Sequence, residues 1–219
     1  MAEPGETVPR YGEQPLEQTV AAAALMRRVA GMVLSLEHPH AAVDDMIERL
    51  TGWERELASA MPPDNSPRMG PAACDDQRIY LDHAADIWTF NPCFPEYAFD
   101  LISEETSHGT VNFPVTYEGP PGFVHGGFLA VFFDCVVQHH SCVTGKSGKT
   151  RSLNMRFRRP TPILTDLHFD VSRSESGAQA DAVARLTLHD EVLCAADIST
   201  LAVPADKLIT SQFGKRRSR

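Results

Sequence analysis

The sequence predicts an α+β fold in which one long helix lies among antiparallel strands and a pair of helices precedes them. Two early runs have apolar residues at helical spacing, later runs are typical of strands, and one apolar run between the second and third strands is too long for a strand. A single helix in this order cannot form a parallel βαβ stack. We therefore expect the helix to pack on one face of an antiparallel sheet.

The helical pair is expected over residues 18–61. The first helix extends from about Val20 to Leu36, where the segment His38-Pro39-His40 interrupts the pattern. The second helix is amphipathic and ends before Met61-Pro62-Pro63. Its apolar face is formed by Val43, Met46, Ile47, Leu50, Trp53 and Leu57.

The rest of the chain divides by composition. Residues 1–17 are predicted to be a mobile arm, residues 62–79 a linker rich in Pro, Gly, Asn and Ser, and residues 205–219 a basic tail. The main domain is expected over residues 80–204. Its strands are predicted at 98–102, 111–116, 153–157, 167–172, 178–188 and 192–203, and its helix at 123–143.

Charge and composition exclude several classes of protein. The 219 residues include 20 Lys and Arg against 29 Asp and Glu, a net charge of −9 that disfavours binding to nucleic acid. No apolar run reaches the roughly 20 residues of a membrane span, and the acidic start lacks a basic leader, so a cytoplasmic protein is expected. The five cysteines are odd in number and scattered, which indicates unpaired thiols.

Three familiar site motifs are incomplete. Gly145-Lys146-Ser147 and Gly148-Lys149-Thr150 resemble the end of a phosphate-binding loop, but the glycine that should stand five residues earlier is absent. No G-x-S-x-G turn occurs. The group Cys135, His139, His140 and Cys142 matches no known ligand spacing, so no metal is expected.

The segment from Tyr117 to Gly127 carries the strongest chemical signal. Its prolines and glycines predict a tight turn, and Gly126-Gly127 would leave the first amides of the following helix open to a ligand. These amides carry the positive end of the helix dipole. An oxygen that gains negative charge, as in acyl transfer, would be stabilised there.

Asp134 lies in the middle of this helix, which is apolar on nearly every side. An unpaired buried carboxylate is costly, so such a residue is usually hydrogen-bonded, protonated or functional, and a general base is one such function. Asp134 follows Gly126 by eight residues, about 12 Å along a helix. One helix cannot bring both to one bond, which predicts a two-fold dimer with two composite sites.

These residues, together with Thr150-Arg151-Ser152 and the run from Leu153 to Pro160, resemble the hotdog-fold acyl-CoA thioesterases of the PaaI and thioesterase-superfamily type. The resemblance covers roughly residues 95–203. It implies a long central helix wrapped by a curved antiparallel sheet and a homodimer joined along sheet edges. It also implies hydrolysis of acyl-CoA thioesters at the dimer interface, with no cofactor beyond the CoA of the substrate. Such dimers often pair into tetramers.

The resemblance assigns roles residue by residue. Asp134 matches the carboxylate that activates water or attacks the acyl carbon, and Gly126 the oxyanion amide. His125 matches the motif histidine, as a positioner of the turn, and Thr150 a hydroxyl that positions the water. Substrate contacts are expected from Gly127, Gln138, Arg151, Arg158 and Arg159. Some relatives have an asparagine where this chain has Gly119, so fewer donors are expected here.

Two other functions stay open at this point. A hotdog protein that binds or senses acyl-CoA without turnover would keep the fold, although the buried carboxylate argues against it. An enoyl-CoA hydratase would need Asp134 to act with His139 or His140 as acid and base. The acyl chain length and the role of the helical pair, as lid, dimer extension or protein-binding element, are not determined by the sequence.

Overall fold

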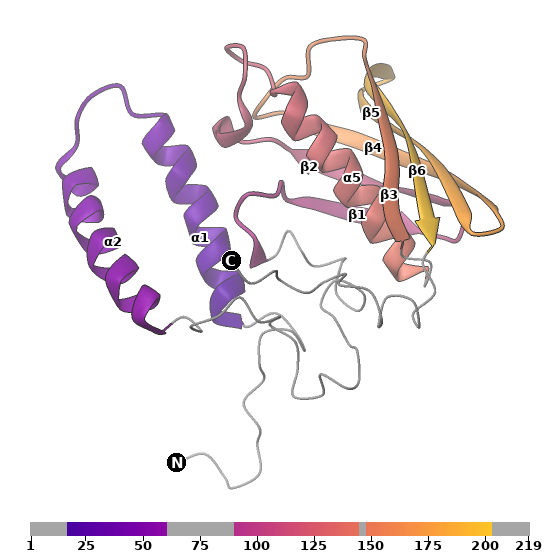
Figure 1. Cartoon of the computed structure of the whole chain (residues 1–219). Coiled ribbons are helices and arrows are strands. Elements are labelled where there is room, and N and C mark those ends of the chain that lie inside the picture. Colours follow the sequence, from indigo (N-terminus) through magenta and orange to yellow (C-terminus); the bar gives the residue numbers. More distant parts are fainter. Residues whose placement is uncertain (1–16, 61–89, 145–147, 203–219) are drawn as a thin grey trace, which may run out of the picture.

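The computed structural model describes residues 17–60, 90–144 and 148–202 (Figure 1). Two helices come first, α1 (Glu17–Leu34) and α2 (Ala41–Ala60), followed by strands β1 (Tyr97–Ile102) and β2 (Thr106–Asn112). A short 3-10 helix, η2 (Val115–Tyr117), leads to the long helix α5 (Gly126–Val143). Four strands complete the chain: β3 (Gly148–Phe157), β4 (Asp166–Ser176), β5 (Gln179–Leu188) and β6 (Glu191–Ala202).

The strands form one antiparallel sheet in the order β1-β2-β4-β5-β6-β3. The sheet curves around α5 (Figure 1). Phe132, Phe133 and Val136 of α5 are fully buried against inward-facing strand residues such as Phe169 and Leu186. Burying each such side chain contributes about 1.5–3 kcal/mol. The predicted α+β hotdog architecture is confirmed.

Strand β2 begins earlier than the sequence pattern predicts. Its inward positions include Ser107 and Gly109, so the apolar alternation typical of a strand is hidden. A Cβ at Gly109 would lie 2.0 Å from the Ala98 carbonyl oxygen, because the neighbouring antiparallel strand β1 comes very close there. Pro114 has no amide hydrogen for a ladder, and the chain turns into η2 instead of continuing the strand to residue 116.

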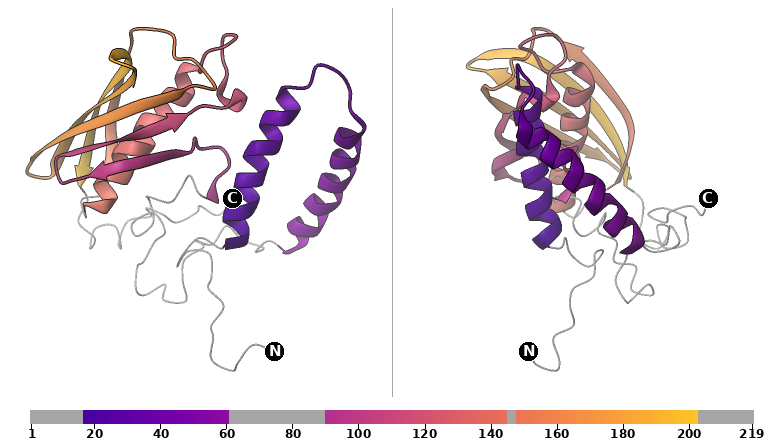
Figure 2. Two further views of the ribbon diagram at one scale, coloured as in Figure 1. Left: turned by 180° about the vertical axis from the view of Figure 1, so that it is seen from behind. Right: turned by 90° about the vertical axis from the view of Figure 1, so that its left-hand side faces the viewer.

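The predicted helical pair is present, and α1 joins it to the rest of the molecule. Ala23 and Arg27 are its buried residues. Arg27 Nε donates to Glu96 Oε1 at 2.8 Å, and Nη1 donates to the Asn91 carbonyl oxygen at 3.3 Å. Helix α2 lies on the outer side of α1, away from the sheet (Figure 2), and none of its residues is buried.

The other predicted segments, the arm before Glu17, the linker at 62–79 and the basic tail at 205–219, lie outside the described residues.

Candidate active site

The turn between η2 and α5 is built as the prolines and glycines predict. The His125 amide donates to the Tyr117 carbonyl oxygen at 2.9 Å, and the Gly119 amide donates to that of Phe123 at 2.8 Å. Gly122 has a φ of 82°, which favours glycine. A Cβ at Gly119 would lie 2.8 Å from His125 Cα. The position that holds asparagine in some hotdog thioesterases therefore accepts only glycine in this turn.

Tyr117, at the start of the turn, is anchored in the core. Its ring meets those of Phe113 and Phe128 edge to face. Burial raises the pKa of Tyr117 to about 12, while the charge of nearby Arg27 opposes this rise. The turn is thus held by the core on one side and lies next to the Arg27 anchor of α1 on the other.

His125 is the N-cap residue of α5. Its Nδ1 accepts a hydrogen bond from the Gly127 amide at 3.0 Å, so the proton of the neutral ring is on Nε2. The Gly127 amide, predicted to bind substrate, is thereby occupied by the cap. No acceptor among the described residues contacts the Gly126 amide. This one N–H at the positive end of α5 is open to an external oxygen.

Asp134 and Thr150 are brought together as predicted. Thr150 Oγ1, at the start of β3, donates to Asp134 Oδ1 at 2.6 Å. Asp134 is half-buried, and its second carboxylate oxygen has no partner within the described residues. Helix α5 is continuous from Gly126 through Asp134, so the predicted separation of about 12 Å holds within one chain.

Gln138 lies one turn beyond Asp134 and also contacts β3. Its Nε2 donates to the Gly148 carbonyl oxygen at 2.7 Å, while its buried Oε1 has no partner in the described part of the chain. Gln138 therefore fixes the start of β3 beside Asp134. Its direct contact with substrate stays a prediction.

The two histidines near the end of α5 are engaged elsewhere. His140 is fully buried, with Nδ1 3.0 Å from Ser107 Oγ and Nε2 2.7 Å from the Ser103 carbonyl oxygen. Burial lowers its pKa. His139 Nδ1 lies 3.2 Å from the Tyr97 hydroxyl. Neither of these contacts includes Asp134, so within the described residues they do not join either histidine to it as an acid and base pair.

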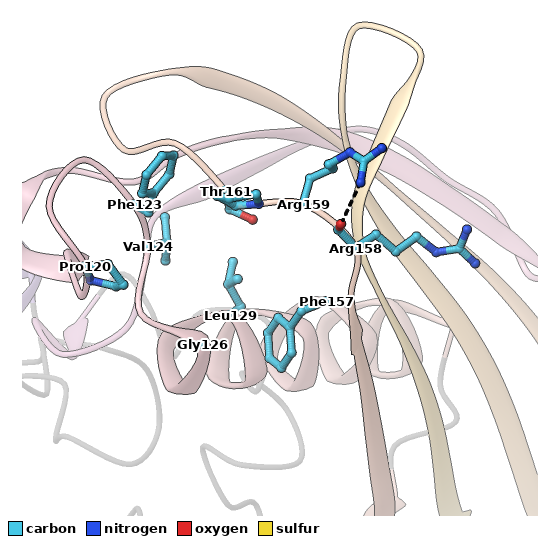
Figure 3. Close-up of a pocket in the computed structure, with 10 residues that line it drawn as sticks. Pro120, Phe123, Val124, Gly126, Leu129, Phe157, Arg158, Arg159 and Thr161 are labelled. Atoms are coloured by element: carbon cyan, nitrogen blue, oxygen red, sulfur yellow. Dashed lines mark hydrogen bonds between the residues drawn. The ribbon is translucent and has the colours of Figure 1, made fainter.

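A pocket of about 530 Å³ opens beside Gly126 (Figure 3). Its walls come from the turn, the first turns of α5 and the segment after β3. Most of the lining is apolar, with two arginines on the β3 side. The lining residues are Pro120, Phe123, Val124, Gly126, Leu129, Phe157, Arg158, Arg159, Pro160 and Thr161.

The arginines near the pocket differ in whether they already form an ion pair. Arg156 pairs with Asp197, and Arg159 Nε donates to Glu191 Oε1 at 2.7 Å. Arg158 lines the pocket, but its guanidinium points away from it (Figure 3) and has no partner in the described part of the chain. Arg151 is exposed on β3, away from the residues that line the pocket. Of the two predicted cations that line the pocket, Arg158 is therefore the one that forms no ion pair within the described residues.

Two residues of this region were missed by sequence reasoning. Phe157 ends β3 and packs on the start of α5, where a Cβ at Gly126 would lie 3.1 Å from Phe157 Cζ. Thr161 is 3% exposed, and its hydroxyl has no partner within the described residues. The sequence offers only a weak signal for them, an aromatic residue and a threonine on either side of Arg-Arg-Pro.

Side chains that could bind a metal ion are scattered over the part of the chain that the structure describes. No cluster of three or more His, Cys, Asp or Glu side chains is arranged to hold a metal ion there. Cys93, Cys135, Cys142 and Cys194 are free thiols. None of the described helices is both long and apolar enough to cross a membrane.

Comparison with known proteins shows the fold. A crystal structure of a thioesterase superfamily protein matches with a TM-score of 0.67 and 23% identity, over 89% of this chain and all of the other. A Streptococcus mutans protein bound to acetyl-CoA matches with a TM-score of 0.48 and 16% identity, over 57% and 94% of the two chains. The match to the first structure agrees with the hotdog fold described above.

At the level of sequence, no family model matches the chain. A segment of 54 residues is 41% identical to the human protein acyl-coenzyme A thioesterase THEM5. The segment is 25% of this chain and 22% of that protein, so the match spans about a fifth of the relative's length.

Proposed function

We propose that this chain is a thioester hydrolase that cleaves acyl-CoA to a free acid and CoA. One observation carries the proposal: the helix whose first amide is open, at Gly126, also bears a carboxylate that is hydrogen-bonded by Thr150. These are an oxyanion donor and a base or nucleophile. The hotdog fold and the short similarity to a protein named as an acyl-coenzyme A thioesterase support the same chemistry.

The two groups act on one thioester only if they come from two subunits. Within one chain they are about 12 Å apart along α5, too far to reach a single carbonyl. We therefore propose a two-fold homodimer with two composite sites, each made from Asp134 of one subunit and Gly126 of the other.

Strand β3 is the edge that would join the subunits. It ends the sheet, and none of its ten residues is fully buried. An exposed edge strand with unpaired amides and carbonyls is a template for pairing with another chain. Antiparallel pairing about a two-fold axis between Leu153 and Asn154 would set Thr150 opposite the partner's Phe157.

This register would assemble the site. Thr150 binds Asp134, and Phe157 packs on Gly126, so a strand pair that joins Thr150 to the partner's Phe157 also brings Asp134 toward the partner's Gly126. Displacing the register by a few residues would separate them. The two contacts at opposite ends of β3 thus favour one dimer.

The reaction follows from these positions. The thioester carbonyl oxygen accepts a hydrogen bond from the Gly126 amide, and Asp134 takes a proton from a water held by Thr150. The hydroxide adds to the carbonyl carbon, and the oxyanion is stabilised at the helix start. The C–S bond then breaks, and the CoA thiolate takes up a proton. Direct attack by the Asp134 carboxylate would give a mixed anhydride that water hydrolyses to the same products.

The pocket beside Gly126 would receive part of the substrate. Its apolar walls suit an acyl or pantetheine chain, and Arg158, whose guanidinium points outward beside it, would offer a cation to a CoA phosphate outside the pocket. Arg159 already pairs with Glu191, so its contribution would be smaller.

Release of free thiol from short, medium and long acyl-CoAs tests the proposal. We would compare the parent with Asp134→Asn and with Asp170→Asn. Asp170 pairs with Arg185 on the sheet and serves as a control for the loss of one carboxylate. We expect turnover by the parent and by Asp170→Asn, and a fall of at least about 100-fold in Asp134→Asn.

Folding and dimerisation of each variant would be verified by circular dichroism and light scattering. A folded parent that releases no thiol from any acyl-CoA would contradict the proposed enzyme and favour a binding or sensing role. Full turnover by Asp134→Asn would contradict the role of Asp134.

A further inference from the structure

Helix α2 carries an apolar stripe that no described part of the chain covers. Leu50, Trp53 and Leu57 are 47%, 53% and 65% exposed. With Val43 and Met46 they recur at alternating intervals of three and four residues, the a and d spacing of a coiled-coil seam. The helix is 20 residues long and buries none of them.

A helix of this kind needs a partner. Most of the stability of a protein helix comes from packing its apolar face rather than from intrinsic propensity. Helix α1 does not supply that packing. Its buried residues are Ala23 and Arg27, whereas α2 has no buried residue that could pack on them. Arg27 instead binds Glu96 and Asn91. Leu50, Trp53 and Leu57 of the stripe therefore stay exposed, while Val43 and Met46 are half-buried.

We propose that α2 pairs with α2 of a second copy of this chain, in antiparallel orientation. A two-fold axis between Leu50 and Trp53 would place Leu50 against the partner's Trp53 and Met46 against the partner's Leu57. Residues at a then meet residues at d along the whole seam, as in antiparallel coiled coils.

The charges beside the seam favour a second copy over a foreign partner. Arg49 and Glu56 flank the stripe on one side, and neither forms an ion pair within the described residues. In the antiparallel pair, Arg49 and the partner's Glu56 flank the same edge of the seam about two residues apart along the axis, within reach of their long side chains, and the two-fold axis repeats this contact. A uniformly acidic or basic partner would satisfy only one of the two charges, whereas a second copy satisfies both.

The α2 pair is compatible with the proposed β3 dimer. Helix α2 is the outermost element on one side of the molecule, and β3 lies beyond α5 on the other (Figures 1 and 2). Each chain would therefore offer two separate surfaces to other copies. The α2 pairing does not depend on catalysis, so its test is independent of thioester hydrolysis.

The molar mass of the full chain in solution tests this inference, measured by sedimentation equilibrium over a range of concentrations. We expect Leu50→Glu to place a charge in the seam, weaken the association at least about 100-fold and halve the mass of the assembly. The variant should keep the fold of the main domain.

Charge reversal tests the pairing of α2 without placing a charge in its apolar seam. Arg49→Glu should weaken the association about tenfold, since two symmetric attractions become repulsions. Adding Glu56→Arg should restore it. The two positions are two turns apart on one helix, so the rescue cannot arise within a chain. Arg55→Glu, on the outer face of α2, is the matched control and should change nothing.

Two results would overturn the proposal. One is an unchanged mass in Leu50→Glu, which would show that the stripe does not join copies of the chain. The other is failure of Glu56→Arg to rescue a weakened Arg49→Glu variant, which would exclude the antiparallel pair. Loss of thioesterase activity alone would bear on neither.

Discussion

Replacing Gly126 by proline removes one hydrogen atom that the proposed reaction depends on. Gly126 is the first residue of α5, where proline is favoured because its missing amide hydrogen is not needed by the helix. The preceding residue, His125, has φ of −66° and ψ of 133°, the conformation preferred before proline. We therefore expect the Gly126→Pro variant to fold.

The expected loss of activity follows from the geometry. The Gly126 amide is the open donor at the helix start, and removing one oxyanion donor typically lowers kcat by about 100-fold to 1000-fold, or about 2.7–4 kcal/mol. The added Cβ would approach Phe157 Cζ at 3.1 Å. That atom is the far end of an exposed side chain and can move aside.

Gly126→Ala is the matched control, because it adds the same Cβ and keeps the N–H. Thiol release from the best acyl-CoA would be measured for both variants at equal dimer content. We expect the alanine variant to stay within a few-fold of the parent. Equal kcat/KM for the proline and alanine variants would refute the role of the Gly126 amide.

Three further predictions concern single residues. Thr150→Val removes the hydroxyl that binds Asp134, so kcat should fall about 10-fold to 100-fold. Thr150→Ser keeps a hydroxyl and should retain most of the parental kcat. Equal kcat values for the valine and serine variants would contradict this role of the hydroxyl. Burial lowers the pKa of His140 below its ordinary 6.5. The unfolded chain therefore binds more protons, and the free energy of unfolding, measured by urea titration, should decline as the pH falls below 6.5. The decline should be less steep in His140→Gln. Burial raises the pKa of Cys194 to about 12, so this thiol should react with iodoacetamide near neutral pH only after unfolding. The exposed Cys93 should react rapidly in the folded protein. Peptide mapping of the alkylated chain would distinguish the two sites.

The sequence predicted the order of elements because the local signals agreed with the tertiary structure. The apolar run at 123–143 could be only a buried helix, and the observed α5 differs by three residues at its start. Strand β2 was misplaced because Ser107 and Gly109 face the core. The close approach of β1 at Gly109, rather than side-chain hydrophobicity, determines those two positions.

The site was predictable where spacing along one helix determines it. Gly126, His125 and Asp134 take their relative positions from α5 itself. Contacts that depend on packing between distant segments were not visible, such as Phe157 on Gly126 and the pairing of Arg159 with Glu191. The His125 cap on the Gly127 amide also required the side-chain geometry, and it reduces the predicted pair of open amides to one.

The composite site can be tested in a dimer that carries one lesion in each chain. Asp134→Asn and Gly126→Pro chains with different affinity tags, both also carrying Leu50→Glu to prevent pairing through α2, would be coexpressed, and the heterodimer purified on both tags. If each site combines Asp134 of one subunit with Gly126 of the other, one site holds both lesions and the other holds neither, so the heterodimer should release thiol at about half the parental rate. If both groups acted within one chain, each site would hold one lesion, and activity no higher than that of the two single variants would contradict the proposed dimer.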